Sequence, residues 1–137
     1  MEYSQTSELY QFLINRFKAK KIHDKYDPEH FGNFSIILSV DSFLINYVQD
    51  RSFLTIEIAS KSDPSNWYPL SSIVQFMVAK QMTNKKLVLS NDDQRIQSLN
   101  EFLSQNFELV ANLFADHNYR KTKGELNTFL KNRFFDR

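Results

Sequence analysis

The sequence contains no cysteine and only two glycines, and these absences remove several kinds of chemistry. Without cysteine there is no disulfide framework, no thiol nucleophile and no cysteine-ligated zinc site. A phosphate-binding loop needs glycines so that its backbone can approach the ligand, and Gly32 and Gly124 are too few to build one. Serines are plentiful, but none lies in a Gly-x-Ser-x-Gly nucleophile elbow. The sequence therefore predicts neither a nucleotide-binding loop nor a hydrolase of that type.

Long apolar runs and targeting segments are also missing. No window approaches the ~18 apolar residues of a membrane-spanning helix. The first residues, Met1-Glu2-Tyr3-Ser4, lack the basic and then apolar stretches of a secretory signal peptide. We therefore expect a soluble, cytoplasmic protein without a membrane partner.

The chain does contain enough apolar material for one folded domain over residues 1–137. Hydrophobic residues make up 42% of the sequence, and 13 residues are Phe. A domain near this size buries roughly 68% of the surface that its unfolded chain exposes, so it can fold without a disulfide or a metal. The net charge of +1 does not select nucleic acid as a partner. Charge is unevenly placed, because residues 41–116 hold nine acids and six bases, whereas residues 117–137 hold two acids and six bases.

Three strand-like segments form the clearest pattern. Apolar and other residues alternate over residues 34–40, 43–48 and 53–59, so each predicted strand has one core face. The linking turns, Asp41-Ser42 and Asp50-Arg51, are too short for a crossover connection. They therefore predict an antiparallel meander.

A helix is expected before these strands. Apolar residues recur at helical spacing within residues 4–21, and the hydroxyl of Ser4 or Thr6 can cap the first turn. Residues 22–33 contain an Asp-Pro pair and a glycine, which favour a loop before the first strand.

Helical patterns also follow the strands. Pro69 suits the first turn of one helix, and apolar stripes predict two more over residues 92–115 and 122–134. Residues 85–89 are consistent with either a short strand or an apolar plug. The order predicts an α+β fold: an N-terminal helix, a three-stranded antiparallel meander, and then about three helices packed on one face of the sheet.

Histidine-based chemistry has little support in the sequence. His23 and His30 lie near several acids in the predicted loop, where imidazole and carboxylate groups can bind zinc or manganese, but solvated loop side chains explain them more simply. Asp116 and His117 lie at a predicted helix end, where a cationic histidine complements the helix dipole. We therefore expect no catalytic residues, no metal and no cofactor.

The basic C-terminal segment offers one alternative function. Tyr119 lies among Arg120, Lys121 and Lys123, and bases beside an aromatic ring can contact phosphate groups and stack on bases. There is no zinc finger and no RNP motif, and a solvated helix face explains the pattern more simply. Nucleic acid is therefore not the expected partner.

Seven acidic and aromatic residues form the candidate surface for a protein partner. Aromatic residues with one polar end are common interface anchors, and acids complement a basic partner. Simpler explanations exist for several of them: local hydrogen bonding in turns and caps, an exposed sheet face, and the seam between helix and sheet. The candidates are Asp50, Glu57, Asp63, Trp67, Tyr68, Asp92 and Asp93.

Residues 34–78 resemble small bacterial immunity proteins, which are partners of polymorphic or contact-dependent growth-inhibition toxins. The resemblance covers about a third of the chain and includes the meander, a polar loop and the start of the following helix. Its most specific points are the charged turn Gln49-Asp50-Arg51 and the helix-opening segment Trp67-Tyr68-Pro69-Leu70.

The resemblance implies a cytoplasmic protein that binds the C-terminal domain of a cognate toxin in a tight one-to-one complex and blocks its active site. It implies no catalytic residues. Many such toxins are nucleases with basic surfaces, which the mildly acidic middle of this chain would complement. The alternatives are a non-catalytic adaptor or regulatory subunit that binds another protein, and an enzyme or nucleic-acid-binding protein.

Overall fold

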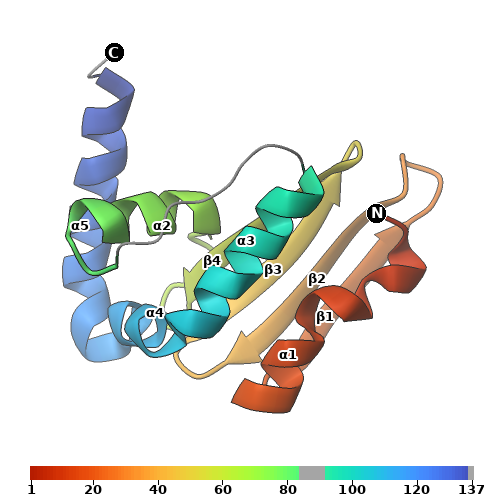
Figure 1. Cartoon of the computed structure of the whole chain (residues 1–137), viewed down its shortest axis with the longest axis horizontal. Coiled ribbons are helices and arrows are strands. Elements are labelled where there is room, and N and C mark those ends of the chain that lie inside the picture. The colour runs from red at the N-terminus through yellow and green to blue at the C-terminus, as the bar shows by residue number, and fades with distance from the viewer. Residues whose placement is uncertain (84–91, 136–137) are drawn as a thin grey trace.

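Four eight-residue strands and one short strand form an antiparallel sheet in the order β1-β2-β3-β4-β5 (Figure 1). The computed structural model describes residues 1–83 and 92–135. The strands are β1 (Lys20–Asp27), β2 (Asn33–Val40), β3 (Phe43–Asp50), β4 (Phe53–Ser60) and β5 (Tyr68–Pro69). The helical elements are the 3₁₀ turn η1 (Tyr3–Gln5), α1 (Ser7–Phe17), α2 (Leu70–Ala79), α3 (Asp92–Gln105), α4 (Phe107–Phe114) and α5 (Asp116–Phe135).

The fold class is α+β, as predicted, with a helix before the sheet and helices after it. The details differ, because the described residues form five strands where three were predicted, and four helices after the sheet where about three were predicted. The three predicted strands are confirmed as β2, β3 and β4, with ends that differ by one or two residues.

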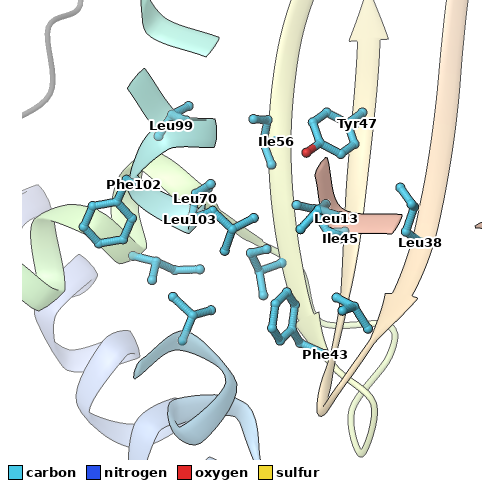
Figure 2. Packing of buried hydrophobic residues seen from close by; sticks show 14 of the residues in the cluster. Leu13, Leu38, Phe43, Ile45, Tyr47, Ile56, Leu70, Leu99, Phe102 and Leu103 are labelled. Carbon is cyan, nitrogen blue, oxygen red and sulfur yellow. The ribbon is translucent and has the colours of Figure 1, made fainter. Parts of the chain in front are cut away.

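The core lies on one face of the sheet. Every second residue of β2, starting at Phe34, is buried, while the residues between them are only half-buried. Figure 1 shows α1 and α3 crossing this buried face. Leu13 from α1 and Leu99 from α3 gather there on Ile45 and Ile56 of the central strands (Figure 2). The alternation in the sequence therefore predicted the core face of each strand correctly.

Helix α2 extends this core past the edge of β4. Its apolar residues Leu70, Ile73, Val74, Phe76 and Met77 are buried, and Pro69 directly precedes the helix. The ring of Phe76 meets the ring of Phe129 on α5 edge-to-face, with 5.8 Å between their centroids. Packing between α2 and α5 therefore continues the hydrophobic cluster beyond the sheet.

The predicted loop over residues 22–33 is wrong, because half of it, residues 22–27, belongs to the edge strand β1. Every residue of β1 from Lys20 to Tyr26 is exposed. Because neither face of this strand is buried, apolar and polar residues do not alternate in its sequence. Its structure comes from backbone pairing with β2, which is interrupted by a bulge between Lys21 and His23. An exposed edge strand bearing lysines and a bulge is protected against pairing with other chains.

The single helix predicted over residues 92–115 is two helices, α3 and α4. Asn106 leaves the helical conformation with φ −121° and ψ 24°, and its side chain donates to the Phe102 carbonyl. The predicted stripe is still buried across the break. Apolar spacing reports which residues face the core, but it does not detect a local change in backbone direction.

The predicted bounds of two other helices also need correction. Helix α5 begins at Asp116, not at residue 122, so Asp116 and His117 lie at a helix start and not at a helix end. The N-terminal helix α1 is shorter than residues 4–21, and the hydroxyl of Thr6 donates to the Tyr3 carbonyl and caps no amide. The predicted strand or plug at residues 85–89 lies outside the described residues.

Candidate functional site

Two turns at one end of the sheet carry the exposed aromatic side chains of the strands. The β1–β2 turn spans residues 28–32 and the β3–β4 turn spans residues 51–52, and Figure 1 shows both at the end near the N-terminus. We call these turns and the strand residues that flank them the hairpin end. It comprises residues 26–33 and 49–53.

The backbone of both turns is left-handed. Phe31 and Gly32 have φ values of 60° and 68°, and Arg51 and Ser52 have φ values of 53° and 69°. In the two-residue β3–β4 turn, paired positive φ values match the twist of the strands. Outside glycine such residues cost about 1 kcal/mol or more each, so Phe31 is held in a conformation that bulky side chains avoid.

Side-chain amides tie the two turns together. The Asn33 Oδ1 atom accepts the Arg51 amide at 2.8 Å, and the Asn33 Nδ2 atom donates to Asp50 at 3.4 Å. Gln49, which is only 4% exposed, donates from Nε2 to the Gly32 carbonyl at 3.4 Å. These bonds link the β1–β2 turn to the β3–β4 turn, so the hairpin end is one connected unit.

Large side chains project from this unit. Phe31 is 71% exposed, Phe53 54% and Tyr26 44%. The ring of Tyr26 stacks on that of Tyr3 at a centroid distance of 4.2 Å, and the guanidinium of Arg95 lies 4.6 Å from the centre of the Phe53 ring. A hollow of about 440 Å³ lies beside Phe31 and is lined in part by Tyr3 and Tyr26.

Charged side chains surround these rings. The side chains of Asp50 and Arg51 are 72% and 80% exposed. Across the β1–β2 turn, the His30 Nδ1 atom lies 2.7 Å from an Asp27 carboxylate oxygen, and this contact lowers the pKa of Asp27. The arrangement of exposed rings with a polar rim is typical of a protein-binding surface.

The structure brings only some of the predicted interface residues to the hairpin end. Asp50 belongs to it, and α3 begins beside it at Asp92, because Arg95 in the first turn of α3 contacts Phe53. The side chains of Asp92 and Asp93 lie outside the described part of the structure. Glu57 lies elsewhere, in the middle of β4 on the face opposite the helices, where burial raises its pKa.

The remaining predicted interface residues lie at the far side of the sheet. Asp63 accepts from the Tyr119 hydroxyl at 2.8 Å and from Lys123 Nζ at 3.0 Å, so its charge is already paired. Tyr68 is buried and donates to Asn127 at 2.7 Å. Trp67 is half-buried directly before β5. Asp63 and Tyr68 are thereby bonded to α5, and none of the three residues forms one surface with Asp50.

Sequence reasoning missed Phe31, Tyr26 and Phe53 as candidate site residues. A phenylalanine directly before a glycine in a turn was the available signal at Phe31, because a turn residue has little core to enter. At Phe53 the signal was the alternation itself, because Phe53 is out of phase with the buried Leu54, Ile56 and Ile58 of β4.

The other candidate chemistry gains no support. Among residues 1–83 and 92–135, no three His, Asp or Glu side chains are placed to hold a metal ion. In the basic segment, Lys123 is bound to Asp63, whereas Arg120 and Lys121 are exposed. A larger hollow of about 980 Å³ lies between α1 and α3, and no histidine lines it.

Comparison of the chain with known protein families, with characterised proteins and with solved structures finds no match. None of the described helices is both long enough and apolar enough to span a membrane. Function therefore has to be argued from the surfaces of this fold.

Proposed function

We propose that this protein is an immunity protein that neutralises a bacterial toxin by placing its hairpin end in the active-site cleft of the toxin. The observation that carries the proposal is the exposure of Phe31, in the β1–β2 turn, and of Phe53, directly after the β3–β4 turn, on two turns that are bonded to each other. Aromatic side chains at the centre of an interface supply much of its binding energy. Two turns at the end of a sheet also form a narrow projection, which suits a cleft.

The connected backbone supports tight binding. A segment that is already ordered loses little conformational entropy on association, so more of its contact energy appears as affinity. Asn33 and Gln49 hold the two turns in place before a partner arrives. An inhibitor that acts in a one-to-one complex needs this kind of preorganised surface.

The charges of the hairpin end suit a cleft that binds phosphate. Asp27, Glu29 and Asp50 are acids in or beside the two turns, with Arg51 and His30 between them. Acidic side chains around an aromatic centre would speed encounter with a basic nuclease and exclude partners of the wrong charge. Asp63, in contrast, is occupied by its bonds to α5.

The first experiment is capture from the native host. Tagged protein would be recovered at high salt and its partner identified by mass spectrometry. The gene of that partner would then be induced in a test strain with and without this chain. Growth arrest that only co-expression of this chain relieves supports the proposal. A stable partner without toxicity would contradict it and favour the adaptor function.

The second experiment tests the hairpin end with Phe31→Asn. Asparagine tolerates a positive φ better than phenylalanine does. The free energy of unfolding of the variant should therefore stay the same or rise by up to about 1 kcal/mol. Loss of a central aromatic anchor should weaken binding of the captured toxin domain by about 2 kcal/mol, roughly 30-fold. Calorimetric titration and urea unfolding measure the two quantities.

Leu109→Asn is the matched control, because Leu109 is a 37% exposed apolar residue on α4. It should leave the affinity unchanged. Equal affinities for the Phe31 variant, the Leu109 variant and the unmodified protein would show that the toxin binds elsewhere.

A further inference from the structure

The face of the sheet opposite α1 and α3 carries a second surface, which we call the open face. The strand register defines its members, because cross-strand neighbours share a face. The polar and apolar residues on β2, β3 and β4 are half-buried, except for the more deeply buried Asn46. The hairpin end contributes Asp27, Asn33, Asp50 and Phe53 to the same face, and Ala59 of β4 lies buried on it. Apart from these residues, the open face consists of Lys20, His23, Lys25, Ser35, Ile37, Ser39, Leu44, Asn46, Val48, Thr55 and Glu57.

Charge on the open face is separated between its two sides. Lys20, His23 and Lys25 lie on the β1 side, while Glu57 lies on β4. His23 and Glu57 lie in the same row, since His23 pairs with Ile37, Ile37 with Asn46, and Asn46 with Glu57. The basic side and the acidic side are therefore at the same height along the strands.

We propose that two copies of this protein associate through their open faces about a two-fold axis parallel to the strands. Such an axis places β1 of one copy against β4 of the other. It does not shift residues along the strand direction, so each row of cross-strand neighbours faces the same row of the second copy. Glu57 then faces His23 of the second copy, between Lys20 and Lys25. Because the interface is isologous, this contact occurs twice.

The middle of the open face suits this arrangement. Ile37, Leu44 and Val48 lie on the two central strands, so β2 of one copy covers the apolar side chains on β3 of the other. Asn46 accepts a hydrogen bond from Ser35 at 3.0 Å, so the side-chain oxygen that enters the interface already has a partner. Polar groups need such partners when they are buried.

The size of the face sets the strength of the dimer. Four strands of eight residues present an area of about 20 by 27 Å. Two such faces together bury on the order of 1,000 Å², near the lower limit for a specific interface. We therefore expect an association in the micromolar range. The axis places both hairpin ends at the same end of the dimer, and the turn residue Phe31 lies beyond the strands that face each other.

Sedimentation equilibrium of the purified protein from 5 to 500 µM, together with light scattering, tests the proposal without any toxin. The unmodified protein should dimerise in this range. Glu57→Lys should weaken the dimer at least tenfold, because it places a base among bases. Glu108→Lys on the exposed side of α4 makes the same charge change and should have no effect.

A charge exchange gives the sharpest test. Lys20→Glu with Lys25→Glu should weaken the dimer on its own, and adding Glu57→Lys to that pair should restore most of it. A monomer at every concentration overturns the proposal. So does an equal effect of the Glu57 and Glu108 variants, or a failure of the exchange to restore association.

Discussion

Tyr47 connects three elements through one side chain. It is fully buried in β3, and its hydroxyl donates to the Asn100 Oδ1 atom on α3 at 2.9 Å. Asn100 in turn donates to the Leu9 carbonyl on α1 at 3.0 Å. Burial raises the pKa of Tyr47, so the phenol stays neutral and needs its acceptor. This chain of two bonds holds both helices over the sheet.

The contribution of this contact can be measured by a double-mutant cycle. Asn100→Ala leaves the Tyr47 hydroxyl buried without its acceptor and should lower the free energy of unfolding by about 2–3 kcal/mol. Tyr47→Phe should lower it by about 1 kcal/mol. The two changes together should cost less than their sum, by about 1 kcal/mol, as urea unfolding would show. Strict additivity would mean that the bond contributes nothing.

At the scale of elements, a polar cluster joins the loop before β5 to α5. Asp63 accepts from Tyr119, Lys123 and Asn66, and the first two bonds are the main reason that its pKa lies below the usual range. Tyr68 adds a bond from β5 to the same helix. Helix α5 is in this way attached by polar contacts as well as by its apolar residues Leu126 and Phe129.

Because of this cluster, the free energy of unfolding should decrease at acid pH. The pKa of Asp63 is lower in the folded state than in the unfolded state. Its contribution to the free energy of unfolding is therefore fully present above the unfolded-state pKa of about 3.9 and is lost as the pH falls through the folded-state pKa. Asp63→Asn should therefore lower stability at pH 7 and reduce the loss of stability between pH 5 and 2. Urea unfolding across that range measures both effects.

At the scale of the whole molecule, one hydrophobic cluster includes residues from the helices and strands on both sides of β4. It extends from Leu9 on α1 to Leu126 on α5. The proposed binding surfaces lie outside this cluster, at the end of the sheet and on the face away from α1 and α3. Binding of a toxin and association of two copies would therefore use adjoining but different surfaces of the molecule.

A shared core predicts cooperative unfolding. Trp67 is the only tryptophan and lies next to β5, so its fluorescence reports on the junction between the sheet and α5. Circular dichroism at 222 nm reports on all helices. Both signals should give the same urea midpoint and slope. An earlier transition by fluorescence would show that the part containing α2 and α5 unfolds separately.

The central strands were predictable because burial on one face leaves a strict alternation in the sequence. Residues Phe34 to Val40 and Leu54 to Ile58 show it directly. β1 was not predictable, because an edge strand exposed on nearly every residue has no alternation to detect. The break at Asn106 was hidden for the opposite reason, since the apolar stripe continues through it.

For the candidate site, the acidic and aromatic residues chosen from the sequence as one protein-binding surface lie apart in space. Asp50, Glu57 and Asp63 are on different parts of the molecule. The spacing of a residue along the chain shows whether its side chain faces the core. It does not show which distant residue that side chain is bonded to.

The sequence by itself determined the α+β class, the core face of each central strand and the lack of cysteine chemistry, because these depend on local pattern and composition. Only the tertiary structure decided that Asp63 is paired with Lys123, that Phe31 is exposed on a left-handed turn and that His23 lies in one row with Glu57. The physical reason is that pairing, exposure and register are set by contacts between segments far apart in the chain.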